Sequence, residues 1–501
     1  MNGRLVWRSA VAAGEQFVDS LWTTPGASSR RAAGASKVST AMSADITIRG
    51  GDVVLDGALV RADIGITGGI VTGISSSPID APNVIDAQGC LVLPGGIDAH
   101  VHLSPAELAD GSYPWVDDFE SGTRAAAAGG VTTVGNITFP RPGEALADAC
   151  RRVAEDVRAQ AVVDVFLHPV VTAQAHLDPG ELSALRELGQ TSIKVFATLG
   201  AFQSHRRQYY RFMAEAGSRG FLTLVHCEDS ELIEHCTTSL VERGLADFRH
   251  FGESRPEAAE EAAVAQLIAF AEVSRTPIYV VHLSSQRALT ACSAARARGV
   301  PVYVETRPLY LYLTEELLQR EDGAKFIGQP PLRRQDDVDA LWAGLRFGTI
   351  DTVATDHAPW TLEQKLEAGA SLEQLRPGVA DLETVRPMLF SEGVLTGRLS
   401  LARFVELTAT NPARLFGLYP RKGTIAPGSD ADLVVWDPDQ TRIVDGSRGE
   451  SRAGYSPYDG TSVRGWPRDV LSRGELIVSE GKVTAPSGRG QLPARGSSAP
   501  H

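Results

Sequence analysis

Histidines end several apolar stretches of this chain, and their spacing suits metal binding. His100 and His102 are two residues apart, and residues two apart on a β-strand face the same side. Both imidazoles could therefore hold one metal ion, although a surface strand can also carry such a pair. His226 follows the apolar run 221–225, and His282 ends a similar run. A hydrogen-bonded core histidine would explain either one alone, but two in successive strand–helix units are less usual.

A lysine and an aspartate occupy comparable positions. Lys194 lies inside the apolar run 191–199, where burial makes the ammonium form costly and lowers the pKa of the amine. A neutral amine can react with carbon dioxide to give a carbamate, which could bridge two metals. The alternative is a lysine that extends to water. Asp356 ends the run 352–355 and precedes His357; it could cap a helix, or it could bind metal and handle the proton of an attacking water.

Taken together, these side chains form one set of nitrogen and oxygen ligands. Each one ends or interrupts an apolar, strand-like run, and separate explanations do not account for that coincidence. Such a set suits zinc or a similar divalent ion. The predicted ligands are His100, His102, Lys194, His226, His282 and Asp356.

The elements that must position these residues alternate between strands and helices. The strand candidates are 162–167, 192–196, 221–226, 277–282, 300–305 and 352–356, and the helix candidates are 117–129, 256–274, 285–299 and 401–408. Repeated strand–helix units with buried strands favour a parallel sheet. The segment 96–418 suits a (β/α)8 barrel, in which catalytic groups stand at the C-terminal ends of the strands. An open, doubly wound sheet is the alternative, but the chain has no glycine fingerprint for a dinucleotide.

The two ends of the chain have a different texture. Short β-branched runs broken by glycine occur at 42–95 and again at 419–485, which predicts a small β-sandwich domain built from both chain ends. Residues 1–41 contain runs of Ala, Ser and Gly and few acids; we expect a disordered N-terminal extension, with a transit peptide as the alternative. Residues 486–501 are expected to form a disordered tail.

The overall composition excludes some partners. The formal net charge of −13 would repel a phosphate backbone, so no nucleic acid partner is expected. No apolar run approaches the ~20 residues that span a bilayer, so no membrane partner is expected either. The five cysteines are odd in number and never form a C-x-x-C pair. This pattern indicates reduced thiols in the cytoplasm.

The order of the ligand candidates resembles one protein family. A His-x-His pair, a strand lysine, two strand histidines and a Thr-Asp-His sequence are arranged as in the cyclic amidohydrolases, which include dihydropyrimidinases, hydantoinases, allantoinases and dihydroorotases. The resemblance runs from about residue 46 to residue 482. The stretches that carry it are Pro94-Gly-Gly-Ile-Asp-Ala-His-Val-His, Gly122-Thr-Arg-Ala-Ala-Ala-Ala-Gly-Gly-Val-Thr-Thr, Pro330-Pro-Leu-Arg, Thr355-Asp-His-Ala-Pro, Asn411-Pro-Ala-Arg-Leu-Phe-Gly-Leu, Gly423-Thr-Ile-Ala-Pro-Gly-Ser-Asp-Ala-Asp-Leu-Val and Tyr455-Ser-Pro-Tyr-Asp-Gly.

This resemblance implies a hydrolase that depends on two divalent metal ions, expected to be zinc. One ion would be held by His100, His102 and Asp356 and the other by His226 and His282, with carboxylated Lys194 as the bridge. A hydroxide between the ions would attack the ring carbonyl carbon, and Asp356 would pass its proton to the leaving nitrogen. The family also implies a homotetramer that acts on a small cyclic amide.

The residues predicted to contact the substrate are Leu199, Arg307, Gln329 and His357. Hydantoinases and dihydropyrimidinases usually carry a tyrosine where this chain has Leu199, and a leucine cannot donate a hydrogen bond to the oxyanion. Many relatives have cysteine in place of Arg307 and serine in place of Gln329. Arg307 could pair with an anionic substituent of the substrate. The alternative is a salt bridge between Arg307 and a nearby acid, with no substrate contact.

The favoured activity is that of a hydantoinase or dihydropyrimidinase. Dihydroorotases usually have an arginine where this chain has Ser104, so a dihydroorotase-like activity ranks lower, and an allantoinase-like activity is a further alternative. A non-catalytic scaffold homologue is the alternative from another class. Such homologues typically lack the metal ligands, and all six are present here.

Overall fold

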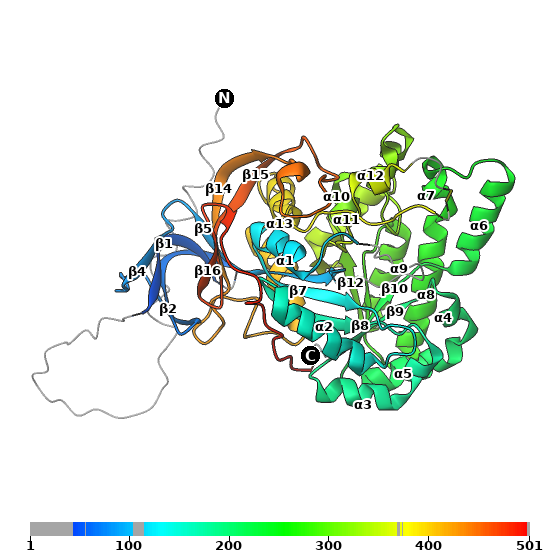
Figure 1. Ribbon diagram of the computed structural model, residues 1–501, viewed down its shortest axis with the longest axis horizontal. Coiled ribbons are helices and arrows are strands. Elements are labelled where there is room, and N and C mark those ends of the chain that lie inside the picture. Colours follow the sequence, from blue (N-terminus) through cyan, green and yellow to red (C-terminus); the bar gives the residue numbers. More distant parts are fainter. Residues whose placement is uncertain (1–43, 56, 104–114, 368–370, 373, 498–501) are drawn as a thin grey trace, which may run out of the picture.

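The computed structural model describes residues 44–55, 57–103, 115–367, 371–372 and 374–497. A strand-rich unit made from both chain ends lies beside a larger barrel (Figure 1). The predicted extension at 1–41 and the last four residues of the predicted tail lie outside the described part.

The barrel strands run parallel in two sheets that are joined into a ring. β6 to β8 make one sheet, and β9 to β13 make the other. Parallel bridges pair Val170 with Lys194 and Val101 with His357 at the two seams. This closure confirms the predicted (β/α)8 barrel. The strands are β6 (Gly96–Val101), β7 (Val131–Thr138), β8 (Asp164–Pro169), β9 (Ser192–Phe196), β10 (Leu222–His226), β11 (Ile278–Val280), β12 (Val302–Thr306) and β13 (Thr352–Val353).

Helices cover the outside of the barrel, so every residue of β7, β8 and β10 is buried. The helices predicted at 117–129, 256–274 and 285–299 are α1, α8 and α9, and the helix predicted at 401–408 is α14 followed by a π-helical turn. Among the described helices, none has both the length and the apolar character needed to cross a membrane. The helices are α1 (Phe119–Ala128), α2 (Leu146–Gln160), α3 (Pro179–Glu187), α4 (Gly200–Ser204), α5 (Arg206–Ser218), α6 (Ser230–Glu242), α7 (Phe251–Ser254), α8 (Glu257–Ser274), α9 (Gln286–Ala297), α10 (Leu309–Tyr312), α11 (Gln335–Phe347), α12 (Leu362–Lys365), α13 (Val385–Leu389), α14 (Leu401–Val405) and α15 (Asn411–Leu415).

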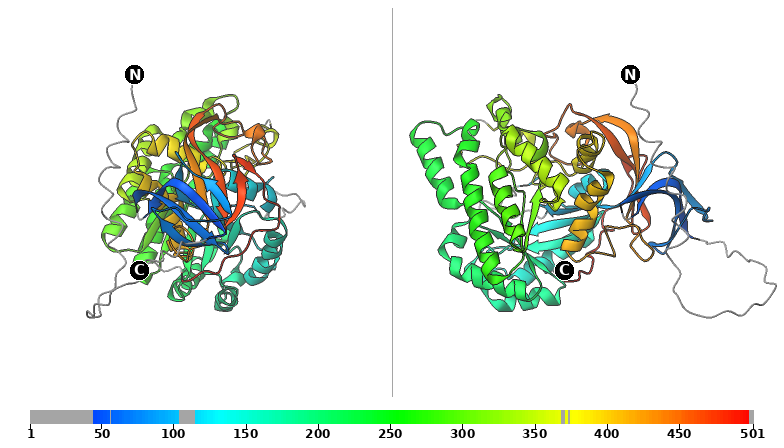
Figure 2. Two further views of the ribbon diagram at one scale, coloured as in Figure 1. Left: turned by 90° about the vertical axis from the view of Figure 1, so that its left-hand side faces the viewer. Right: turned by 180° about the vertical axis from the view of Figure 1, so that it is seen from behind.

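The small domain combines both chain ends, as predicted, and its strands are hydrogen-bonded into one nine-stranded sheet. β5 pairs with β14, so strands distant in sequence lie side by side (Figure 2). Apolar side chains from both ends, including Ile64 and Val435, pack into a core of their own. The strands are β1 (Ile46–Leu55), β2 (Ala58–Thr67), β3 (Ile70–Ser75), β4 (Asn83–Asp86), β5 (Leu91–Pro94), β14 (Leu433–Ile443), β15 (Ser462–Ser472), β16 (Glu475–Ser479) and β17 (Lys482–Val483).

A buried ionic cluster joins this domain to the barrel. The ammonium of Lys422 lies 2.8 Å from an oxygen of Asp164 in β8, 3.1 Å from one of Asp430 and 2.6 Å from one of Asp432. These three carboxylates could by themselves hold a cation. Because Lys422 already supplies the positive charge between them, the cluster is a structural tie between the two units.

The C-terminal segment differs from the prediction. Residues 486–497, expected to be disordered as part of 486–501, run along the barrel and hydrogen-bond to it. Arg489 donates to one backbone carbonyl of the barrel at 2.7 Å and to one of the small domain at 2.8 Å. Arg495 donates to the Oγ atom of Ser192 at 2.9 Å. Polar contacts, rather than a periodic apolar face, order this segment, which is why its sequence pattern gave no sign of structure.

Deleting residues 486–501 should therefore lower the melting temperature by at least about 3 °C, because buried acceptors lose their charged donors. Deleting only residues 498–501 removes none of the contacts described above and serves as the control. Thermal unfolding followed by circular dichroism makes the comparison. Equal melting temperatures for the longer deletion and the full chain would show that these contacts contribute nothing.

Candidate active site

The predicted ligands meet at the C-terminal ends of the barrel strands. They come from the strands or from the residues directly after them: His100 and His102 from β6, Lys194 from β9, His226 from β10, His282 from β11 and Asp356 from β13. All are buried, and the histidines and the aspartate line a cavity of about 180 Å³. His282 (φ 39°) and Asp356 (φ 51°) have left-handed backbone conformations, which are costly for residues with a Cβ atom and cluster at functional sites.

His100, His102 and Asp356 form a compact group of metal-binding type. The Oδ1 atom of Asp356 lies 2.9 Å from Nε2 of His102 and 3.3 Å from Nε2 of His100. One ligand atom from each residue falls within 4.8 Å of the others. Burial would raise the pKa of Asp356, but His100 and the guanidinium of Arg307 hold this pKa well below its usual value. The group therefore offers two nitrogens and an ionised carboxylate to one cation.

Lys194 lies next to this group without a carboxylate in direct contact. Its side chain is completely buried, and its Nζ atom is 3.3 Å from Nε2 of His100. Within the described part of the chain, no carboxylate oxygen lies within 4.0 Å of this Nζ atom. Burial lowers the pKa of the Lys194 amine to about 8. Burial thus makes the neutral amine, the form that reacts with carbon dioxide, more accessible than in an ordinary lysine.

His226 and His282 form a second pair, and the ring centroid of His282 lies 5.5 Å from that of His100. The ring centroids of the pair are 4.5 Å apart. Nε2 of His226 contacts Oε2 of Glu228 at 2.7 Å, which leaves Nδ1 as the nitrogen available to a metal. Nδ1 of His282 is buried and has no hydrogen-bond partner among the described residues. Burial lowers the pKa of all four histidines, and the neutral imidazole is the form that binds metals.

Glu305 contacts two of the predicted metal ligands through its carboxylate. Its carboxylate lies 2.9 Å from Nδ1 of His100, accepts the backbone N–H of His282 at 2.9 Å and accepts the hydroxyl of Tyr279 at 2.8 Å. The sequence analysis did not single out this role, because a glutamate within a strand gives no sign of its partner. Such a contact fixes which nitrogen of His100 faces the cavity.

The residues predicted to contact the substrate do not all line the cavity. Gln329 lines the cavity. Leu199, at the start of α4, is 37% exposed and is not among the described residues that line the cavity. Arg307 is completely buried, and its Nη1 atom donates to Oδ2 of Asp356 at 3.0 Å. For Arg307 the structure therefore shows the salt bridge that was the alternative to substrate contact.

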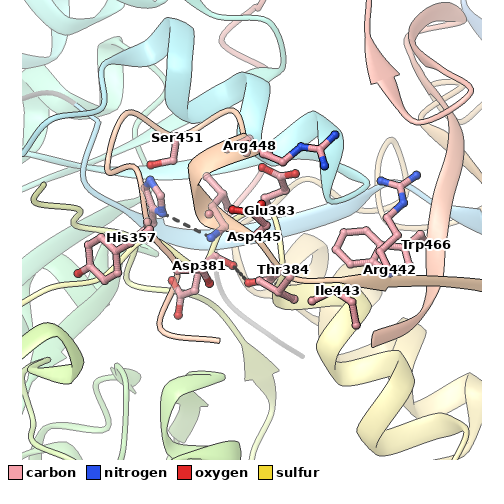
Figure 3. A pocket seen from close by; sticks show the side chains of 18 residues that line it. His357, Asp381, Glu383, Thr384, Arg442, Ile443, Asp445, Arg448, Ser451 and Trp466 are labelled. Atoms are coloured by element: carbon pink, nitrogen blue, oxygen red, sulfur yellow. Dashed lines mark hydrogen bonds between the residues drawn. The ribbon is translucent and has the colours of Figure 1, made fainter. Parts of the chain in front are cut away.

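His357 also points away from the cavity. Its Nε2 atom lies 2.9 Å from Oδ2 of Asp117, and its Nδ1 atom accepts the backbone N–H of Leu382 at 3.4 Å. It lines a second cavity, of about 440 Å³, between the barrel and the residues that follow β14 (Figure 3). Both ring nitrogens are thus occupied by structural contacts.

Aromatic side chains that the sequence analysis missed form much of the cavity wall. Trp115 packs on His102 with ring centroids 4.7 Å apart, and Phe139 lies 5.8 Å from Trp115 and 6.0 Å from Phe196. Trp360 is fixed by a hydrogen bond from its Nε1 atom to a backbone carbonyl at 2.9 Å. Three of these residues lie outside the strands and the fourth ends one, so no periodic pattern indicated them.

Known proteins resemble this chain in fold and in sequence. A model of the amidohydrolase family matches residues 91–477. The chain is 37% identical over 440 residues to a D-hydantoinase of Ralstonia pickettii, a match covering 87% of this chain and 96% of the relative. It is 38% identical over 452 residues to a D-phenylhydantoinase of Escherichia coli O1:K1 / APEC, covering 89% and 97%. A solved D-hydantoinase from Bacillus sp. AR9 superimposes with a TM-score of 0.85 at 35% identity, covering 90% of this chain and 99% of that one.

The barrel, the small domain and the buried histidine–aspartate group define a hydrolase of metal-dependent type. The chain belongs to the amidohydrolase family, whose model spans most of its length. Within that family it is a cyclic amidohydrolase of the hydantoinase and dihydropyrimidinase group, as its strand-end residues predicted.

Replacing Glu305 by glutamine should weaken metal binding about 10–100-fold, because His100 loses the carboxylate that orients its ring. Glu260 is also buried, but its carboxylate accepts from Ser284, so Glu260→Gln is the matched control. Zinc titration of chelator-treated protein against a competing chelator measures the effect. An unchanged affinity in Glu305→Gln would contradict the supporting role of Glu305.

Proposed function

We propose that this protein hydrolyses a C–N bond in a cyclic amide or imide, in the manner of a hydantoinase or dihydropyrimidinase. The observation that supports this proposal most strongly is that the buried histidines and Asp356 line one small cavity. The names of the relatives, D-hydantoinase and D-phenylhydantoinase, support it. A non-catalytic scaffold is a weaker proposal, because burying so many polar side chains costs folding free energy and a scaffold gains no metal or activity in return.

We propose that the centre holds two zinc ions and a carboxylated lysine. His100, His102 and Asp356 would hold one ion, His226 and His282 the other, and the carbamate of Lys194 would join them. Two such ions would polarise a ring carbonyl and lower the pKa of water at the site. The Nδ1 atom of His282, which has no hydrogen-bond partner among the described residues, fits this assignment, since a bound ion would satisfy it. Lys194 fits it too, because its buried amine contacts only Nε2 of His100, at 3.3 Å, and a carbamate there would lie beside both ions.

Asp356 is proposed to carry the proton. It is the only carboxylate among the described residues that line the cavity. Its Oδ1 atom faces His100 and His102, and its Oδ2 atom accepts from Arg307. Asp356 can therefore take a proton released beside the histidines and return it to the leaving ring nitrogen.

The cavity wall favours a ring with an apolar or aromatic substituent. Trp115, Phe139, Phe196 and Trp360 present aromatic surface to the cavity and exclude water from it. Gln329 is the neutral polar side chain on the same wall, so its amide could hydrogen-bond to the ring. The substrate class is thus a small, substituted cyclic amide.

The oligomeric state and the compartment are proposed from the family and the cysteines. The protein would act as a homotetramer in the cytoplasm. All five cysteines are free thiols, and four of them are buried, which fits a reducing compartment. Light scattering of the purified protein measures the oligomeric state directly.

Lys194→Ala should lose most bound metal and nearly all activity, because it removes the atom that would carry the bridging carbamate. Lys422→Ala is the matched control, since Lys422 is equally buried but lies in the ionic cluster between the two units. Elemental analysis and turnover are measured together on both variants. Full metal content and full activity in Lys194→Ala would exclude the bridge.

Asp356→Asn should keep the fold and lose about 10²–10⁴-fold in kcat, since asparagine has nearly the same shape but cannot accept the proton. Circular dichroism checks the fold, and initial rates on a 5-substituted hydantoin give kcat. A loss smaller than about tenfold would assign the base to another group.

Leu199 is not among the described residues that line the cavity, and its side chain cannot donate to an oxyanion, so the wild-type chain should turn over unsubstituted dihydrouracil weakly compared with a substituted hydantoin. Leu199→Tyr should raise kcat on dihydrouracil by about tenfold or more, given that one such donor is typically worth ~10²–10³. Leu199→Phe supplies the same bulk without the hydroxyl and serves as the control. Equal gains in both variants, or no gain in either, would reject the missing-donor explanation.

A further inference from the structure

Arg307 is a buried cation placed between two carboxylates. Its Nη1 atom donates to Oδ2 of Asp356 at 3.0 Å, and its Nη2 atom lies 3.8 Å from Oδ2 of Asp381. The side chains of Arg307 and Asp381 are completely buried. A guanidinium in such a place is tolerated only where anions compensate its charge.

Asp381 has little charge compensation apart from Arg307. Neither of its carboxylate oxygens has a hydrogen-bond partner among the described residues, and Arg307 is the only cation within 4.0 Å of it in that part of the chain. Asp381 lines the second cavity (Figure 3). It is not among the described residues that line the first cavity, so Arg307 is the contact through which it can affect Asp356.

The two oxygens of Asp356 therefore have different partners. Oδ1 faces His100 and His102, whereas Oδ2 is held by Arg307. Rotation of the carboxylate would break the contact with Arg307, so the guanidinium fixes which oxygen is presented to a cation. It also places a positive charge next to a proposed metal ligand, and such a charge opposes cation binding unless an anion offsets it.

We propose that Arg307 and Asp381 form a charge-neutral strut that orients Asp356 and sets the affinity of the centre for its metal. Arg307 supplies the orientation, and Asp381 cancels the charge that Arg307 brings. Both are positioning residues, since neither contacts the cavity. This inference rests on the proposed metal-dependent function.

If this proposal holds, the effect of Asp381→Asn on zinc affinity depends on the charge of the side chain at position 307. Asp381→Asn leaves the Arg307 charge uncompensated, so zinc affinity should fall by about tenfold. In an Arg307→Met background there is no charge to compensate, and the same change should alter zinc affinity by less than about threefold. In an Arg307→Lys background the charge remains, and the loss caused by Asp381→Asn should reappear.

The measurement is zinc titration of chelator-treated protein with a competing chelator. It is made at about pH 8.5, where Asp381 is ionised although burial raises its pKa to about 7. Arg386→Met is the matched control, because Arg386 is equally buried but donates to the backbone carbonyls of Gly130 and Pro94. This variant should lower the melting temperature and leave zinc affinity unchanged.

The outcomes separate the strut from the function on which it rests. If the wild-type chain binds no zinc, the proposed function fails. If the wild type binds zinc but Asp381→Asn binds it equally well, or loses affinity to the same extent with and without the Arg307 charge, the strut is overturned. A loss that appears only with a cation at position 307 supports it.

Discussion

The structure of the site depends on one constraint: titratable side chains are buried side by side at the C-terminal ends of the barrel strands, away from water. Lys194 is the extreme case: it is completely buried, and no carboxylate in the described part of the chain lies within 4.0 Å of its amine. Keeping an ammonium in such a place would cost several kcal/mol. The cost falls when the amine is neutral, and a carbamate between two cations would turn an unfavourable position into a favourable one. The proposed metal centre would therefore remove the cost of burying this lysine.

Other buried side chains of the site are paired with groups that offset their charge or fix their orientation. His100 is oriented by Glu305, and His226 contacts Glu228, which accepts two hydrogen bonds from Arg255. Burial would raise the pKa of Glu228, but the nearby Arg255 and His226 lower it to about 2. His100, His226 and Asp356 thus each have a buried charged partner, and Glu228 has Arg255 as its own counter-charge. The aromatic wall excludes water, so these contacts gain strength from the low local dielectric.

The sequence predicted the features that follow from strand periodicity. Strand-end residues such as His226 were recognised because a polar side chain interrupts an apolar run, and the barrel brings all these ends to one rim. Residues whose role depends on tertiary partners were not predictable. Arg307 could not be distinguished from a substrate contact until Asp356 and Asp381 were seen on either side of it, and Trp360 lies in a loop without periodicity. The segment 486–497 shows no apolar pattern, because polar contacts order it.

We propose one dinuclear centre, bridged by a modified lysine, at the barrel mouth. Diffraction from crystals of the purified protein at the zinc absorption edge tests it most directly. We expect one anomalous peak among His100, His102 and Asp356, a second beside the other two histidines, and electron density that extends from Nζ of Lys194 toward both. Absence of metal peaks at these positions, together with an unmodified Lys194, would contradict it.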